Sequence, residues 1–175
     1  MQIREAQPSD LDSIVQLHAR SWRVAYRGIL SNTYLDGDLL ADRMALWKPR
    51  FDTPAANQYI AVAEIDNTVV GLACAFGAHD AVWGNLLENL HVSPTLKGAG
   101  IGAQLVAHVA QWCAQTQSAT GLHLWVLQGN TAAQGFYKRL GASAVEQSVW
   151  DAPDGNSVPE LRFAWPSVAH LLQKP

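Results

Sequence analysis

The sequence predicts an α/β (α+β) protein in which a single mixed, mostly antiparallel central sheet is flanked by helices on both faces. Three observations support this. Short apolar strands alternate with segments of helical periodicity along the chain. A strand–helix–strand–helix run in the middle implies a right-handed crossover between parallel neighbours, and the outer strand pairs imply antiparallel hairpins. The chain has 175 residues, 49% of them hydrophobic, and no internal repeat, which suits one domain over residues 1–175.

The N-terminal half is expected to contain four strands and two helices. Pro8-Ser9-Asp10 opens the first helix, and apolar residues then recur at three- and four-residue steps as far as Ile29. Asp66-Asn67 supplies a turn between two strands. The strands are expected at residues 3–6, 59–65, 68–76 and 86–92, the second helix at residues 38–48, and a proline-containing loop at residues 49–58.

The C-terminal half is expected to contain two helices and three strands. Residues 100–115 carry one apolar stripe and predict a helix, and a second helix over residues 130–140 ends at Gly141. Residues 122–127 are nearly all apolar, which is typical of an interior strand. Two final strands, at residues 144–150 and 158–165, flank a turn-rich linker.

Composition excludes several classes of function. The net charge of −3 leaves no broad basic surface, so we expect no nucleic-acid partner. We also expect no membrane partner, because no apolar run could span a bilayer and charges with a proline stand where a signal peptide needs an apolar stretch. Cys74 and Cys113 form neither a CxxC pair nor a metal cluster. The expectation is therefore a cytoplasmic protein with two core cysteines and no metal.

The most informative segment is the glycine-rich loop between the strand ending at residue 92 and the helix at residues 100–115. Gly98, Gly100 and Gly102 allow unusual torsions and close approach of a ligand to the backbone. The first turn of the helix offers unpaired N–H groups and the positive end of its dipole, a combination that binds phosphate or pyrophosphate. Lys97 adds a cation.

Three other interpretations of these glycines compete with phosphate binding. The spacing from Gly98 to Ala103 also fits the dinucleotide fingerprint G-x-G-x-x-[GA], but residues 93–97 intervene between strand and glycine, and the next strand ends in Leu127-Gln128 rather than an acidic residue. No Lys-[Ser/Thr] pair follows a matching glycine spacing, which excludes a Walker A loop. A glycine-rich helix entry without a ligand remains the structural alternative.

A second segment, residues 122–142, completes a resemblance to a known family. Asn130 is placed to cap the helix that follows Gly129. VSPTLKGAGIG resembles the coenzyme A loop of the GNAT superfamily of N-acetyltransferases, and NTAAQGFYKRLGA resembles its later helix. Lys97 stands where that family usually has Arg or Gln, and Ala142 stands where it usually has Phe. The match covers residues 86–142 well, and the element order matches over nearly the whole chain.

The resemblance implies a GNAT-like fold and transfer of an acetyl group from acetyl-CoA to a primary amine by direct attack in a ternary complex. It implies that the backbone of residues 90–92 pairs with the pantetheine arm, that N–H groups of the glycine loop bind the pyrophosphate, and that Asn130 contacts the pantetheine region. The cofactor-binding residues it implies are Leu90, His91, Val92, Lys97, Gly98, Ala99, Gly100, Ile101, Gly102, Asn130 and Tyr137.

Acyl transfer needs a neutral amine, a donor for the oxyanion and a proton for the departing thiolate. A backbone N–H near Leu90 could serve the oxyanion, and Tyr137 is the candidate general acid, with a core aromatic as the alternative. Glu88 lies two residues before Leu90 and is expected on the same face, where it could act as a base directly or through water. The alternative is a salt-bridged or substrate-orienting carboxylate. His91 is expected to point to the opposite face as a packing or hydrogen-bonded residue.

The acceptor pocket is expected between the first two helices. Trp22 and Tyr26 lie one turn apart and could contact a cation or ring, and Trp83 is a further candidate, with His79 and Asp80 within reach. Expected acceptors are small-molecule or peptide amines, and a homodimer through the late strands is a further expectation. A non-catalytic acyl-CoA sensor and a nicotinamide or flavin oxidoreductase remain the rival functions.

Overall fold

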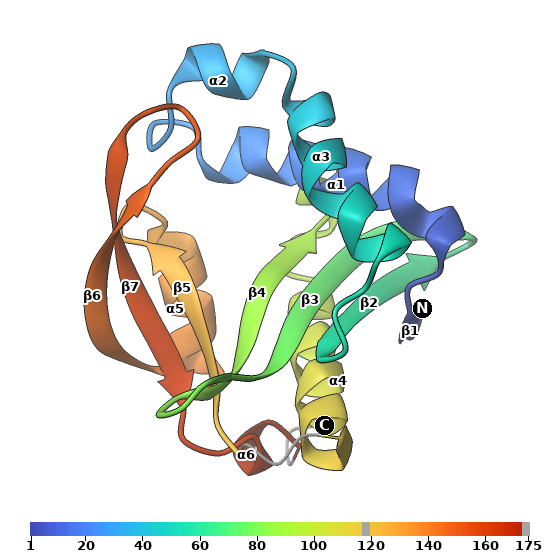
Figure 1. Cartoon of the computed structure of the whole chain (residues 1–175), viewed down its shortest axis with the longest axis vertical. Coiled ribbons are helices and arrows are strands. Elements are labelled where there is room, and N and C mark those ends of the chain that lie inside the picture. The colour runs from blue at the N-terminus through green and yellow to red at the C-terminus, as the bar shows by residue number, and fades with distance from the viewer. Residues whose placement is uncertain (117–119, 173–175) are drawn as a thin grey trace.

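The computed structural model describes residues 1–116 and 120–172, and its centre is one seven-stranded sheet in the order β1-β2-β3-β4-β5-β7-β6 (Figure 1). The strands are β1 (Gln2–Glu5), β2 (Gln58–Ile65), β3 (Thr68–Asp80), β4 (Gly84–Val92), β5 (Leu122–Leu127), β6 (Ser143–Asp151) and β7 (Ser157–Trp165). The helices are α1 (Leu11–Ala25), α2 (Asn32–Asp36), α3 (Leu39–Asp52), α4 (Ile101–Thr116), α5 (Thr131–Arg139) and α6 (Ala169–Leu172), with 3₁₀ turns at Pro8–Asp10 and Pro94–Leu96.

Strand pairing confirms a mixed, mostly antiparallel sheet. Among the strands of the described residues, only β4 and β5 pair in parallel, and α4 lies in the connection between them. The other adjacent pairs in the described part of the chain are antiparallel. The nearly continuous apolar strand β5 lies inside the sheet, between β4 and β7, as its composition predicts.

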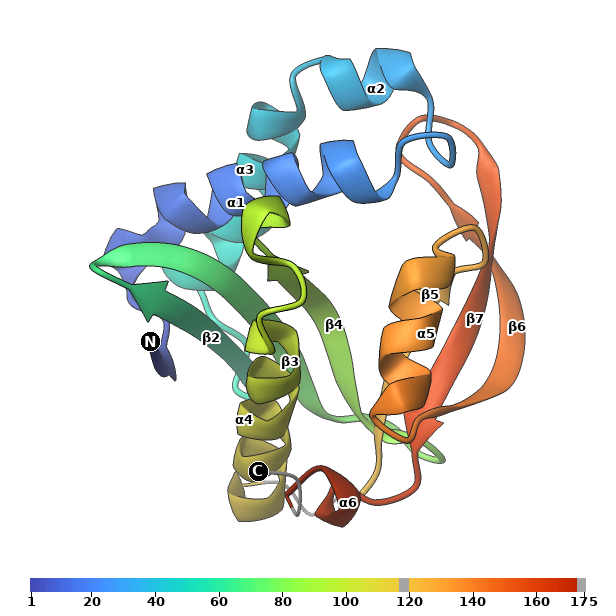
Figure 2. The same ribbon diagram turned by 180° about the vertical axis from the view of Figure 1, so that it is seen from behind.

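Helices cover both faces of the sheet, as predicted, and each face has its own core. Alternation along β3 divides the side chains: Ala73 and Ala75 belong to the core beneath α4, whereas Leu72 and Cys74 belong to the core beneath α1 and α3. Figure 2 shows α4 and α5 together on the first of these faces. Both cysteines are buried and unpaired, which confirms them as core residues.

Several elements differ from their predicted bounds. The first helix ends at Ala25 rather than near Ile29, and α2 and α6 are additional short helices. Strand β3 continues to Asp80 through the stretch expected to be irregular. Helix α3 runs through Pro49 to Asp52, where a loop is expected, because Trp47 and Phe51 on either side of the proline pack against the sheet.

Two irregularities of β4 create an opening in the sheet. Only Asn85 and Leu86 of β4 pair with β5, opposite Leu122 and His123, so the two strands separate beyond that point (Figure 1). Cys74 pairs with Asn89 and Ala75 with Leu87, which leaves Glu88 as the extra residue of a β-bulge. In the described residues, no helix is both long and apolar enough to cross a lipid bilayer.

Candidate active site

A cavity of about 890 Å³ occupies the region where β4 and β5 separate, a size typical of ligand sites. The start of α4 and one side of α5 form one wall, and α1 and α3 form the other. Short stretches of β5, β6 and β7 close it. The cavity is therefore one continuous space that reaches from the glycine loop on one face of the sheet to α1 on the other.

Unpaired N–H groups gather where α4 begins, at the end of the cavity lined by Gly98 and by residues 100–103. Gly98 and Gly100 have φ of +88° and +79°, a region that favours glycine. The N–H groups of Gly98, Gly100, Ile101, Gly102 and Ala103 have no hydrogen-bond partner among the described residues. We call these five groups the amide cluster. They face a cavity at a helix N-terminus, which is the arrangement that binds an anionic phosphate.

Ala99 departs from the predicted set. Its N–H donates to the carbonyl oxygen of Leu96 at 3.3 Å, and the residue does not line the cavity. Ala103, which the predicted set omits, lines the cavity instead. Gly102 also allows α5 to pack closely on α4, because a Cβ there would lie 3.2 Å from the ring of Phe136, close enough that the ring would have to shift slightly.

The backbone of β4 is free to pair with a ligand at alternate residues. Ser93 donates its N–H to Val70 on β3 at 2.8 Å, so the alternation of an antiparallel ladder turns the N–H and carbonyl of His91 toward β3 as well. The same alternation directs the backbone groups of Leu90 and Val92 toward the opening between β4 and β5. The predicted backbone role therefore fits Leu90 and Val92 and does not fit His91.

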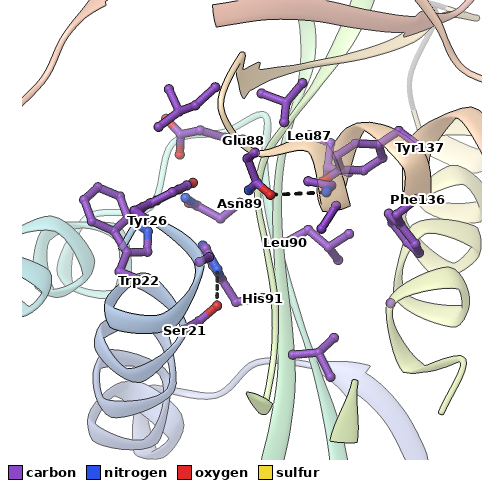
Figure 3. A pocket seen from close by; sticks show the side chains of 18 of the residues that line it. Ser21, Trp22, Tyr26, Leu87, Glu88, Asn89, Leu90, His91, Phe136 and Tyr137 are labelled. Carbon is purple, nitrogen blue, oxygen red and sulfur yellow. Dashed lines mark hydrogen bonds between the residues drawn. The ribbon is translucent and has the colours of Figure 1, made fainter. Parts of the chain in front are cut away.

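The side chain of His91 lies on the α1 side of β4, as expected for a packing histidine. Its Nδ1 lies 3.0 Å from Ser21 Oγ (Figure 3). Its ring stacks on His18 with centroids 4.2 Å apart. Burial, reinforced by the charges of Arg43 and Lys97, lowers the pKa of His91 to about 3. The ring is therefore neutral near pH 7. It can donate and accept hydrogen bonds, but it does not readily take up a proton.

Asn130 and Tyr137 lie on the α5 side of the cavity. Asn130 caps α5, as predicted, with its side-chain oxygen accepting the Ala133 N–H at 3.2 Å, which leaves its amide N–H groups for a ligand. Tyr137 is buried against Phe163 and Trp165, yet its hydroxyl has no hydrogen-bond partner in the described part of the chain. Burial raises the pKa of Tyr137, so the phenol stays protonated and can donate.

Glu88 does not share a face with Leu90. The bulge interrupts the strict alternation of β4, and Figure 3 shows Glu88 on the side of Tyr26 and His91, opposite Tyr137. Its carboxylate makes a close ion pair with Arg50 on α3, and Arg50 also donates to Asn89 Oδ1 at 2.8 Å. The expected position on the Leu90 face is thus wrong, and the carboxylate lies on the opposite wall of the cavity.

The wall formed by α1 and α3 lies where the acceptor pocket is predicted, so we call it the acceptor wall; it contains two of the three aromatic residues expected there. Trp22 and Tyr26 line the cavity with ring centroids 4.9 Å apart. Trp83 does not, because it belongs to the β3–β4 turn and its carbonyl lies beside Gly121.

His79 and Asp80 also lie outside the cavity. Asp80 accepts hydrogen bonds from the backbone of Val82 and Trp83 and from Arg162. Both residues lie at the end of β3, next to the β3–β4 turn, so this stretch is structural rather than part of the acceptor pocket.

Arg43 and Arg50 line the cavity and were not anticipated from the sequence. Arg50 lies in the part of α3 expected to be a loop, and Arg43 is one of several cations on helices with no distinguishing spacing. Within residues 1–116 and 120–172, no group of three or more His, Cys, Asp or Glu side chains is placed to bind a metal ion.

Comparison with known proteins gives a consistent result. The sequence model of the acetyltransferase (GNAT) family matches residues 11–142. An uncharacterized N-acetyltransferase of Archaeoglobus fulgidus is 30% identical over 145 residues, 78% of this chain and 89% of that protein. Peptidyl-lysine N-acetyltransferase YjaB of Salmonella typhimurium is 32% identical over 113 residues, 65% of this chain and 68% of that one.

A solved structure shares the same fold. PaiA N-acetyltransferase from Thermoplasma acidophilum, in complex with coenzyme A, superposes with a TM-score of 0.69 at 20% identity, covering 91% of this chain and 96% of that one.

Proposed function

Because the chain belongs to the GNAT acetyltransferase family, we propose that it transfers the acetyl group of acetyl-CoA to a primary amine by direct attack within a ternary complex. The observation that carries the proposal is the continuity of the cavity. One space joins the amide cluster, the open backbone of β4, the Tyr137 hydroxyl and the acceptor wall of α1 and α3. A thioester bound along β4 and an amine on the acceptor wall would meet at the opening in the sheet.

Binding of acetyl-CoA fits the residues present. The amide cluster would bind the pyrophosphate, and the N–H and carbonyl groups of Leu90 and Val92 would pair with the amides of the pantetheine arm. The side-chain amide of Asn130 faces the same region. These are main-chain and amide contacts, so the site recognises the shape and charge of the thiol carrier.

Tyr137 would act at the leaving group. Its protonated hydroxyl, without a protein partner in the described residues, would donate to the coenzyme A sulfur as the carbon–sulfur bond breaks, so that the thiolate does not depart unsolvated. A backbone N–H of β4 that faces the opening would donate to the acetyl oxygen while it carries negative charge. The Tyr137 ring packs against Phe163 and Trp165 and the backbone donor belongs to β4, so both donors would need little rearrangement when the substrate binds.

Glu88 would act on the amine. Its carboxylate lies on the acceptor wall and is oriented by Arg50, so it would accept the amine proton through a water molecule rather than by direct contact. His91 is a weaker candidate for a base because it is neutral with a strongly lowered pKa. Its ring would instead form part of the wall against which the amine packs.

The acceptor class follows in part from relatives and in part from the cavity. YjaB is named for peptidyl-lysine acetylation, whereas the cavity here is bounded by α1, α3 and β6 and is large enough for a whole small amine. We propose a small-molecule amine. A non-catalytic acyl-CoA sensor would use the amide cluster in the same way but would not need Tyr137.

The test is an acetyl-transfer assay with an amine panel, following coenzyme A release and the acetylated product by mass spectrometry. The wild-type protein is expected to turn over at least one amine. Tyr137→Phe is expected to lower kcat by about 10²- to 10⁴-fold while the Kd for acetyl-CoA changes less than about twofold. Turnover that Tyr137→Phe leaves intact would remove this residue from the acid role, and acetyl-CoA binding without turnover of any amine would favour the sensor.

A further inference from the structure

Arg43 on α3 presents buried donors that the protein does not satisfy. Its side chain is only 7% exposed and lines the cavity. Nη2 donates to Asp42 at 2.6 Å and lies 3.4 Å from the Tyr34 hydroxyl. Within the described residues, Nε is buried without a partner and Nη1 makes no hydrogen bond. A guanidinium has five N–H donors and no acceptor, so Nη1 and, once it is uncovered, Nε can donate to an oxygen from outside the protein.

Trp22 on α1 adds a second donor of the same kind. It is 7% exposed and lines the cavity, and its indole Nε1 is buried without a partner in the described part of the chain. The guanidinium carbon of Arg43 lies 3.9 Å from the centre of the Trp22 ring. The two unsatisfied groups are therefore neighbours on one wall. Both nitrogen atoms are covered in the free protein, so a carboxylate would reach them through a shift of the Arg43 side chain, which borders the cavity.

Open donors, rather than net charge, distinguish Arg43 from its neighbour Arg50. Both guanidiniums are ion-paired, Arg43 with Asp42 and Arg50 with Glu88, but Arg50 donates further to Asn89, whereas Nη1 of Arg43 makes no hydrogen bond within the described residues. Carboxylates of Asp151 and Glu160 line the β6–β7 side of the cavity. The cavity thus offers a cation with open donors on its α3 side and acidic groups elsewhere, a distribution that matches a ligand carrying both signs.

We propose that the acceptor is a small amine that also carries a carboxylate, as a free amino acid does, and that Arg43 with Trp22 binds this carboxylate. The inference rests on the proposed function and names its substrate class. Charge-assisted hydrogen bonds to carboxylate are stronger than neutral ones, and a buried donor without a partner is costly, so the wall favours a carboxylate over a neutral or cationic group. A polyamine would place a second cation against Arg43.

The first experiment uses the wild-type protein and needs no variant. A panel of free α-amino acids is assayed, and each acceptor is compared with its carboxamide and its decarboxylated amine, which keep the reacting nitrogen. We expect kcat/KM to fall about 10- to 100-fold when the carboxylate is removed. Equal kcat/KM for acid, carboxamide and amine would overturn the proposal.

Variants of the wall residues then test which side chains cause the preference for a carboxylate. Arg43→Met is expected to abolish the preference for the carboxylate by raising KM for the acid, with little change for the decarboxylated amine. Trp22→Phe keeps an aromatic ring but removes the N–H, and it is expected to reduce the preference several-fold. Lys48→Met is the matched control, because Lys48 is an exposed cation of the same helix, paired with Asp52 and outside the cavity. A uniform loss for all three compounds in Arg43→Met would contradict the assignment.

Calorimetry separates this inference from the proposed function. The three compounds are titrated into the protein loaded with coenzyme A, which measures the preference without turnover. If Arg43→Met does not fold, the wild-type series and Trp22→Phe still decide. Preferential binding of the carboxylate without acetylation would contradict the proposed function alone, whereas acetylation without a carboxylate preference would contradict the inference alone.

Discussion

Replacing Gly100 with alanine perturbs the amide cluster without touching the rest of the site. Gly100 has φ of +79°, and a Cβ at this position would have only Gln104 Nε2 within 4 Å, at 3.9 Å. Steric collision with the protein is therefore negligible, and the substitution acts through the left-handed backbone torsion. Since the next residue begins α4, any relaxation of that torsion moves the N–H groups that face the cavity.

The size of the effect follows from the torsion. An alanine in the left-handed region costs about 1–2 kcal/mol, partly offset in stability by about 0.4–1 kcal/mol from the stiffer unfolded chain. In the free protein the loop can escape the strain by changing conformation. Binding acetyl-CoA would require the original torsion again, so the affinity should fall by about 1–2 kcal/mol, which corresponds to about 5- to 30-fold in Kd.

The assay is calorimetric titration with acetyl-CoA beside thermal unfolding of each protein. Gly141→Ala is the matched control, because Gly141 has φ of +93°, would have no atom within 4 Å of an added Cβ, and follows α5 outside the cavity. We expect Gly100→Ala to lose affinity, because binding requires the torsion from which its loop has relaxed, and Gly141→Ala to keep its affinity; thermal unfolding checks that both variants are folded. Equal affinities in the two variants would refute the role of the amide cluster.

Three further predictions concern the acceptor wall, the core and the pH dependence of stability. Glu88→Gln should lower the transfer rate and recover part of it at higher pH, where more free amine exists; a flat pH response would remove Glu88 as base. Trp47→Phe should lower the free energy of unfolding by about 2–4 kcal/mol in urea, because it removes the donor to buried His18 Nδ1 at 2.8 Å, and a change below about 0.5 kcal/mol would contradict this. Hydrogen bonding from Arg4 lowers the pKa of Asp10 in the folded protein. The ionised carboxylate therefore stabilises the fold above pH ~4, and this contribution is lost as the pH falls through the lowered pKa. Asp10→Asn should reduce the free energy of unfolding by about 1–3 kcal/mol at pH 7 and by progressively less in acid, as measured by urea unfolding at each pH.

Local sequence signals predicted the geometry of the glycine loop and of the α5 cap well. The positive φ at Gly98 and Gly100, the helix start at Ile101 and the Asn130 cap each depend on residues within one turn of one another. Such features are dictated by the chain locally, through glycine torsions and helix-end hydrogen bonding. The fold class followed in the same way from strand and helix periodicity.

The acceptor wall depended on tertiary contacts that the sequence does not display. The bulge that turns Glu88 toward Arg50 arises from the register between β3 and β4, which no single strand specifies. Pro49 predicts a helix end, yet packing of Trp47 and Phe51 extends α3 and brings Arg50 into the cavity. Trp83 lies outside the cavity because β3 and β4 are both longer than their sequence patterns indicate, which places Trp83 in the short turn between them.

The central claim is that the N–H groups at the start of α4 bind the pyrophosphate of acetyl-CoA while its thiol arm lies against β4. A crystal structure of the protein grown with coenzyme A tests this most directly. The account predicts phosphate oxygens within hydrogen-bond distance of the Gly100–Ala103 amides and a pantetheine arm paired with Leu90 and Val92. A diphosphate bound elsewhere, with these amides facing solvent, would contradict it.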